Sequence, residues 1–185
     1  LADVHFPRDL GPKLIAYRTC AVAASDIAAC GGKLKWLSIA LTVNTKKKQW
    51  IEDFSKGIKE FSDKYKVPII GGDLTLGKEI SVSVGVCGEI EKKDFMRRNK
   101  GKEKDLIFVT GILGEAFAGL NLLKQKKQKL NPSEKNCLKR YLKPKIDFLF
   151  SQDLSKIANS CIDISDGLMA CLLYTSPSPR DSASS

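Results

Sequence analysis

The sequence is 185 residues long, and 43% of its residues are hydrophobic and 28% are charged. This length can bury a real core, and this composition excludes a disordered chain. The 31 Lys and Arg residues against 21 Asp and Glu residues give a formal net charge of +10, which would suit a nucleic acid, an anionic membrane or a phosphorylated small molecule.

The basic residues gather in short polar stretches without interleaved aromatic residues, so we expect solvated loops and helix ends and no nucleic-acid partner. No apolar run approaches the length of a membrane-spanning helix, so we expect no membrane partner either. The six cysteines lack the close spacing of a zinc or redox motif, and most lie in apolar segments. Buried reduced thiols of this kind predict a cytoplasmic protein. The first residue is not Met, which predicts that the chain begins within a longer protein.

The first half of the chain predicts alternating helices and strands. Residues 12–30 are rich in Ala and end at a Gly-Gly pair, which predicts a helix with a glycine stop. Residues 36–43 form a short β-branched apolar run and predict a strand, and the apolar residues between 50 and 65 recur at helical spacing. Residues 67–70 predict a brief buried strand that runs into a turn at Gly71-Gly72-Asp73, and strict alternation between residues 80 and 86 predicts a half-buried strand.

The second half begins with a polar, basic stretch, residues 91–104, which we interpret as a domain boundary. After it we predict strands over residues 105–110 and 161–164, a turn over 111–114, and helices over 115–123, 131–141 and 144–158. The mixture predicts an α/β (α+β) fold. The domains are expected at residues 1–95 and 96–171, followed by residues 172–185, a stretch with two prolines and no periodicity that we interpret as a non-native tail.

Two acidic positions in the first half could carry chemistry. Asp26 follows Ser25 in a helix otherwise made of small apolar residues, where a carboxylate is costly to bury without a partner. It is either an exposed surface residue or a cation ligand. In Gly71-Gly72-Asp73, the glycines let the backbone approach a phosphate and Asp73 could take a magnesium ion, although a plain turn explains the same residues.

The most informative motif is Ile162-Asp163-Ile164-Ser165-Asp166-Gly167-Leu168. In an extended segment Asp163 and Ser165 point to the same side, and the turn at Asp166 can bring the second carboxylate round. Hard oxygen ligands on one short turn are what magnesium needs, with bound phosphates completing its coordination. A helix cap at Ser165 or Asp166 is the competing interpretation, but it leaves Asp163 unexplained. Arg98 could grip phosphates, and His5 is by default an incidental surface residue.

In their order and spacing these segments resemble the thiamine-monophosphate kinase family across nearly all of residues 4–168. The matching pieces are Val4-His5-Phe6-Pro7, Asp9-Leu10-Gly11, Ser25 to Ala29 with Gly31 and Trp36, Gly71 to Thr75, Arg98, Asp105 to Gly111 with Gly114, and Ile162 to Leu168. The family transfers the γ-phosphoryl group of ATP to thiamine monophosphate. Its wider superfamily, which includes aminoimidazole ribonucleotide synthetase, shares an N-terminal α/β domain that pairs in a homodimer and an α+β C-terminal domain.

The resemblance implies roles for particular residues. The magnesium-ligand positions are Asp26, Asp73, Asp163 and Asp166, the ATP-contact positions are Gly72, Asp73, Arg98 and Ser165, and the substrate-contact position is His5. No side chain is expected in a covalent catalytic role, because phosphoryl transfer needs positioning and charge neutralisation, and we expect direct in-line transfer.

The sequence also departs from the family. Its acidic motifs before Val4 and everything after Leu168 are absent, so we expect this polypeptide alone to have little or no kinase activity. Asn99-Lys100-Gly101 replaces a Ser-Gly-Ala-like turn after Arg98, and Leu74 stands where threonine is usual. The alternatives are another ATP-using member of the superfamily, such as the purine enzyme, and a basic nucleic-acid-binding module.

Overall fold

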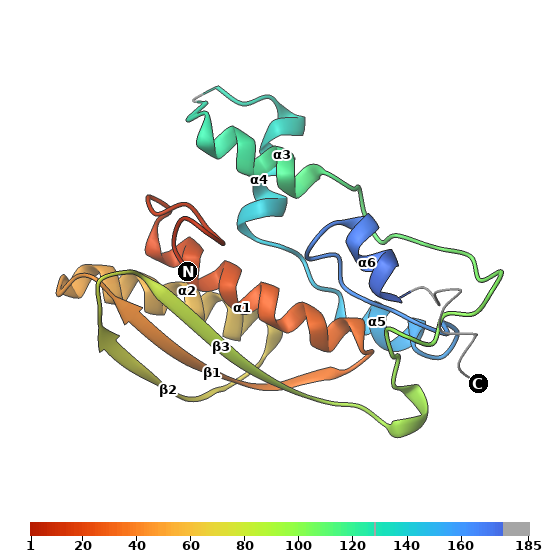
Figure 1. Cartoon of the computed structure of the whole chain (residues 1–185). Coiled ribbons are helices and arrows are strands. Elements are labelled where there is room, and N and C mark those ends of the chain that lie inside the picture. Colours follow the sequence, from red (N-terminus) through yellow and green to blue (C-terminus); the bar gives the residue numbers. More distant parts are fainter. Residues whose placement is uncertain (128, 176–185) are drawn as a thin grey trace.

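Helices and strands alternate along the first half of the chain, and helices with long irregular connections make up the second (Figure 1). This computed structural model describes residues 1–127 and 129–175. In chain order the elements are α1 (Pro12–Ala29), β1 (Lys33–Val43), α2 (Lys48–Tyr65), β2 (Ile69–Leu76), β3 (Ser81–Glu89), a 3₁₀ turn (Lys92–Asp94), α3 (Glu115–Lys124), α4 (Pro132–Leu142), α5 (Phe148–Leu154) and α6 (Leu168–Thr175). The predicted α/β (α+β) class is confirmed.

The helix α1 begins and ends where its sequence predicts. Pro12 occupies the first turn, where its missing N–H costs nothing. At the other end Gly31 adopts a left-handed conformation with φ of 82°, and its N–H donates to the Ala28 carbonyl at 2.8 Å. A Cβ on Gly31 would lie 2.8 Å from the Cβ of Ser155, so the position also allows a close approach of the second half of the chain.

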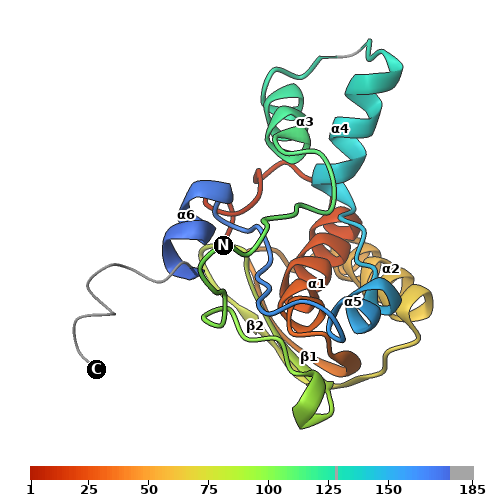
Figure 2. The same ribbon diagram turned by 90° about the vertical axis from the view of Figure 1, so that its right-hand side faces the viewer.

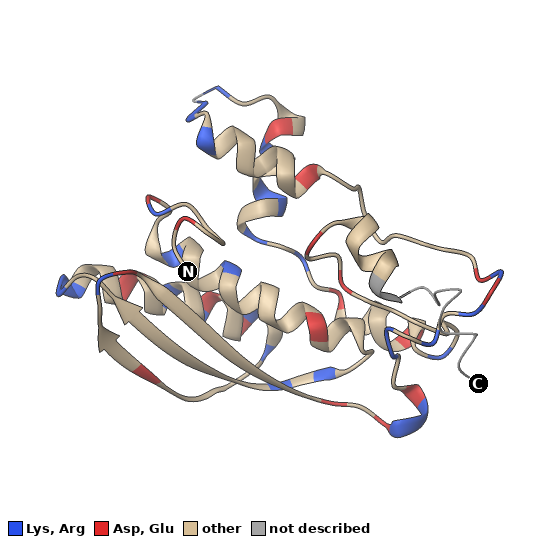
Figure 3. Cartoon of the chain, viewed as in Figure 1, with Lys and Arg blue, Asp and Glu red and all other residues tan. Residues whose placement is uncertain are grey.

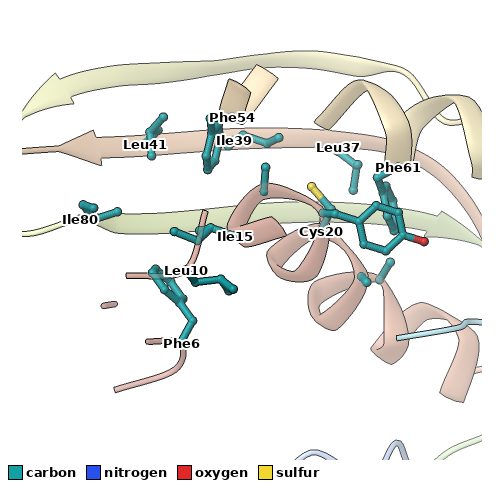
Figure 4. Close-up of a cluster of buried hydrophobic side chains, with 14 of the residues drawn as sticks. Phe6, Leu10, Ile15, Cys20, Leu37, Ile39, Leu41, Phe54, Phe61 and Ile80 are labelled. Atoms are coloured by element: carbon teal, nitrogen blue, oxygen red, sulfur yellow. The ribbon is translucent and has the colours of Figure 1, made fainter. Parts of the chain in front are cut away.

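The sheet has the order β2-β1-β3, in which β1 pairs parallel with β2 and antiparallel with β3. The helices α1 and α2 lie on one face of it (Figures 1 and 2). Alternate residues of β1 are buried against these helices, and the core they form is filled by large side chains of α1 and α2 (Figure 4). Among the most deeply buried are Tyr17, Leu37, Phe54 and Phe61. The predicted elements of this half are therefore confirmed, except in β2.

The prediction for β2 was wrong in two respects. The strand does not stop before a turn at Gly71-Gly72-Asp73 but runs through these residues to Leu76. It is also not buried, because every residue of β2 is exposed. The physical reason is its place at the edge of the sheet, where neither α1 nor α2 covers it.

In the second half the helices are confirmed and the strands are not. α3 and α4 match their predicted ranges, whereas α5 is shorter than residues 144–158 because the Asp147 side chain accepts a hydrogen bond from the Phe150 N–H and caps the helix there. Residues 105–110 and 161–164 contain no strand. A strand needs a neighbour, and the only pairing near either segment, in the described part of the chain, is an isolated bridge between Arg97 and Ser160.

The tail predicted to be non-native lies mostly outside the described residues. Within them, residues 172–175 continue the helix α6. None of the described helices is long and apolar enough to cross a membrane.

Candidate functional site

Two of the predicted acidic residues come together near the end of α1. Asp26 lies in the last turn of this helix, and Asp163 lies in the extended segment after α5. The Ser25 hydroxyl lies 2.5 Å from Asp163 Oδ2 and 2.7 Å from the Val22 carbonyl, and its single proton can serve either acceptor. Residues 138 positions apart in the sequence therefore form one site.

The electrostatics of this pair are unfavourable without a cation. Asp26 is exposed by its accessible surface, but neighbouring atoms still desolvate it in part, and this raises the pKa of its carboxyl. The neighbouring negative charge of Asp163, together with a hydrogen bond to it, raises this pKa further. No Lys or Arg forms an ion pair with Asp26 or Asp163 in the part of the chain that the structure describes. Two adjacent carboxylates and a hydroxyl, without a basic partner, fit a hard divalent cation such as magnesium.

The segment that carries Asp163 is held by hydrogen bonds to the predicted boundary stretch and to the residue that follows it. The Ser160 hydroxyl lies 2.8 Å from the carbonyl oxygens of both Arg97 and Arg98. Next to it, the Asn159 amide donates to both carboxylate oxygens of Asp105 at 3.0 Å. The Arg98 backbone thus contacts Ser160, which lies three positions before Asp163 in the sequence, whereas the Arg98 side chain is exposed.

Two cysteines that sequence reasoning did not assign to the site lie beside the carboxylates. The pKa of the Cys30 thiol is raised by burial first and then by the charges of Asp26 and Asp163. Burial likewise raises the pKa of the Cys161 thiol, with smaller contributions from Cys30 and Asp163. Both thiols are therefore protonated at neutral pH. The signal for them was present, because Cys30 follows Asp26 by one helical turn and Cys161 precedes Asp163 by two residues.

The first-half candidates Gly72 and Asp73 lie on β2, in the sheet. Asp73 pairs in register with Ala40 of β1, is exposed, and accepts a hydrogen bond from the Leu74 N–H at 2.9 Å. A Cβ on Gly72 would collide with the Ile39 carbonyl. The strand pairing alone therefore requires glycine at this position, whatever else it contacts.

The remaining candidates are exposed. Ser165 and Asp166 occupy the bend before α6, where Gly167 has φ of 94°. His5 lies in the N-terminal loop, with its Nδ1 3.4 Å from the terminal amine. Within the described residues no three or more His, Cys, Asp or Glu side chains are grouped so as to hold a metal ion. The structure thus pairs Asp26 with Asp163 and does not bring Asp73 or Asp166 into a common cluster with them.

A family comparison agrees with the fold of the first half of the chain. Residues 1–90 match the family model described as AIR synthase related protein, N-terminal domain. The first half of the chain therefore has the fold of this class of proteins.

Within this class the predicted resemblance to thiamine-monophosphate kinase is confirmed. The chain is 40% identical over 169 residues to the thiamine-monophosphate kinase of Buchnera aphidicola subsp. Schizaphis graminum, covering 91% of this chain and 52% of that protein. It is 37% identical over 173 residues to the Escherichia coli K12 enzyme, covering 93% and 53%. The structure of AaThiL complexed with AMPPCP and TMP superposes with a TM-score of 0.85 at 34% identity, covering 91% of this chain and 54% of that one. The chain spans about half the length of the curated relatives it matches.

Proposed function

We propose that this chain forms part of an ATP-dependent kinase that phosphorylates thiamine monophosphate to thiamine diphosphate. The observation that carries the proposal is the contact of Asp26 and Ser25 with Asp163. It joins the motif at residues 25–29 and the motif at residues 162–168 into one site whose carboxylates suit a cation. Two comparisons support the proposal. The relatives are named thiamine-monophosphate kinase, and the similar AaThiL structure is a complex with AMPPCP, an ATP analogue, and with TMP, the phosphate acceptor.

In the proposed reaction the acceptor phosphate attacks the γ-phosphorus of ATP in line, and ADP leaves without a phosphoenzyme. Asp26, Asp73, Asp163 and Asp166 would hold magnesium in this proposal. When bound, magnesium neutralises phosphate charge during the transfer. The Ser25 hydroxyl keeps the Asp163 carboxylate oriented toward Asp26. Retention of configuration at phosphorus in an isotope-labelled substrate would contradict direct transfer.

The other candidate residues take contact roles in this proposal. Gly72, Ser165 and the Arg98 side chain contact the nucleotide, and His5 contacts thiamine monophosphate. All are exposed and therefore accessible to ligands. The proposal further includes a cytoplasmic homodimer. Each of its chains has one domain over residues 1–95 and a second domain that begins at residue 96.

The kinase proposal can be tested in a chimera in which this chain replaces the matching part of the Escherichia coli enzyme, since the chain covers only 53% of that protein. We expect the chimera to form thiamine diphosphate from ATP and thiamine monophosphate, and the chain alone to show little or no turnover. Asp163→Asn should lower the rate on the order of 100-fold, because it removes one charge from the proposed cation site. Asp153→Asn is the matched control, since Asp153 lies on α5 and forms an exposed ion pair with Lys156.

Two outcomes would contradict the kinase proposal. One is a folded chimera that consumes ATP equally well without thiamine monophosphate, which would favour another ATP-using member of the superfamily. The other is an Asp163→Asn chimera as active as the Asp153→Asn control.

A further inference from the structure

A groove with an apolar floor and a lysine rim runs along α4, away from the carboxylate pair. It is a cavity of about 230 Å³ between α4 and the start of α1. Its floor consists of Leu14, Leu138 and Leu142, and its rim of Lys135, Lys139 and Lys143. We call these six residues the α4 groove. Each floor leucine is only half-buried, so the groove presents apolar surface that the described residues leave uncovered.

The apolar floor continues on the other side of Leu138. A second cavity, of about 360 Å³, lies between the α3–α4 hairpin and the N-terminal loop and shares this leucine. Its apolar lining includes Leu10, Leu122 and Leu123. Its polar lining consists of Asp9, Lys126 and Lys127, of which Lys126 forms an ion pair with Asp9 and Lys127 with Glu134. Two apolar cavities separated by one leucine can receive two apolar side chains of the same ligand.

Two of the three lysines on the rim of the α4 groove carry a positive charge that no ion pair among the described residues neutralises. Lys135, Lys139 and Lys143 recur every four residues and so stand on one side of α4 and its end. Lys143 forms an ion pair with Glu60, whereas no ion pair of Lys135 or Lys139 occurs among the described residues. Residues 124–145 contain nine Lys and Arg residues against one acidic residue, Glu134. Figure 3 shows basic residues over the hairpin loop and α4.

We propose that the α4 groove binds an amphipathic helix of a partner protein, one with apolar anchors on one face and acidic residues beside them. Charge complementarity and spacing support this occupant. Carboxylates four residues apart on such a helix match lysines four residues apart on α4, and apolar side chains at the same spacing can enter the two cavities. This inference is independent of the proposed kinase activity.

Other polyanions fit the groove less well. A nucleic acid would use the lysines but gains nothing from the leucine floor, and the nearby aromatic residue Tyr141 is buried beneath Arg18 and cannot stack on a base. An anionic membrane is bound by apolar side chains that protrude, whereas these leucines line a hollow.

The test uses the whole chain and a labelled synthetic helical peptide. The peptide has leucines at positions 1, 4 and 8, so that successive leucines are about one helical turn apart on one face, and it has glutamates beside them. Fluorescence anisotropy should detect saturable binding that weakens with salt. The doubly substituted chain Lys135→Glu/Lys139→Glu should bind at least tenfold more weakly. Lys46→Glu/Lys47→Glu, the same charge change in the connection between β1 and α2, should bind within twofold of the unsubstituted chain. Because all four lysines are exposed, these variants should fold normally, which circular dichroism checks.

The peptide is varied as well, so that the result does not depend on the fold of a variant. Replacing its leucines by serine, or its glutamates by lysine, should abolish binding. The proposal is overturned if the leucine-free peptide binds equally well, if the two double variants bind alike, or if the unsubstituted chain does not bind. It is also overturned if a single-stranded RNA or a phosphatidylserine vesicle binds more tightly than the peptide and loses binding in Lys135→Glu/Lys139→Glu.

Discussion

Residues 1–90 and residues 97–175 use apolar side chains in different ways. The main hydrophobic core comes from the first region, with Ile146 as the one buried member from the second. In the second region Leu106 and Phe108 are 80% and 83% exposed. The helices and β1 of the first region thus bury their apolar residues against one another, whereas β2 and the segment around Leu106 and Phe108 leave theirs exposed.

The comparison predicts its largest effect at the aromatic core. Phe61 is fully buried and contacts the rings of Tyr17 and Tyr65, with centroids 5.6 and 4.7 Å away. Phe61→Ala should therefore lower the free energy of unfolding by about 3–5 kcal/mol. Phe108→Ala, the same change in the second region, should have almost no effect because Phe108 loses little contact.

Urea unfolding of both variants measures this difference. Similar losses of stability at Phe61 and Phe108 would show that the second region buries its apolar residues after all.

A smaller effect is expected where helices cross closely in each region. A Cβ on Gly57 of α2 would collide with the Lys13 carbonyl of α1, and a Cβ on Gly119 of α3 would collide with the Cys137 carbonyl of α4. Either Gly→Ala change forces the helix pair apart, at a cost of about 1–3 kcal/mol.

The two glycine variants should differ in how far the disturbance spreads. We expect Gly57→Ala to speed amide hydrogen exchange throughout the core and Gly119→Ala to speed it only in α3 and α4. Global acceleration in Gly119→Ala would contradict the separation of the two regions.

The sequence predicted best what depends on local pattern. The helical spacing of residues 50–65 was enough to predict α2, and the glycine at position 31 was enough to predict the end of α1, because propensity, periodicity and capping agree there. Residues 105–110 carry an equally good strand pattern but form no strand, since a ladder needs a second chain segment that the local pattern cannot supply.

The site shows the same limit. The family motifs indicated that Asp26 and Asp163 have related roles, and the structure brings them into contact. The sequence spacing places Cys30 near Asp26 and Cys161 near Asp163, but only the crossing of α1 and the Asp163 segment shows that the two cysteines belong to one site. Asp73 and Asp166 stay predictions, because they lie on β2 and in the bend before α6, and no contact among the described residues joins them to the Asp26–Asp163 pair.

The smallest expected effect is the pH dependence of the free energy of unfolding, which has opposite signs at Asp26 and at Asp105. The pKa of Asp26 is raised above its ordinary 3.8, so the stability it contributes is present at low pH and is lost as pH rises through the raised value. The pKa of Asp105 is lowered from 3.8 by hydrogen bonds from the Lys102 N–H and Asn159, so its contribution is lost as pH falls.

Urea midpoints measured from about pH 3 to about pH 7 test these signs. Asp26→Asn should become more stable relative to the unsubstituted chain as pH rises, and Asp105→Asn less stable. A difference that does not change with pH for Asp26→Asn would mean that folding does not raise the pKa of the Asp26 carboxyl.

The central claim is that Asp26 and Asp163 form one cation site, and Mn²⁺ binding measured by electron paramagnetic resonance in the presence of AMPPCP tests it most directly. Asp26→Asn and Asp163→Asn should each weaken Mn²⁺ binding by about tenfold or more. Asp53→Asn, which changes a half-buried carboxylate paired with Lys56 on α2, should leave the affinity unchanged. If the unsubstituted chain binds Mn²⁺ no more tightly than the Asp26→Asn and Asp163→Asn variants, the two carboxylates do not form a cation site.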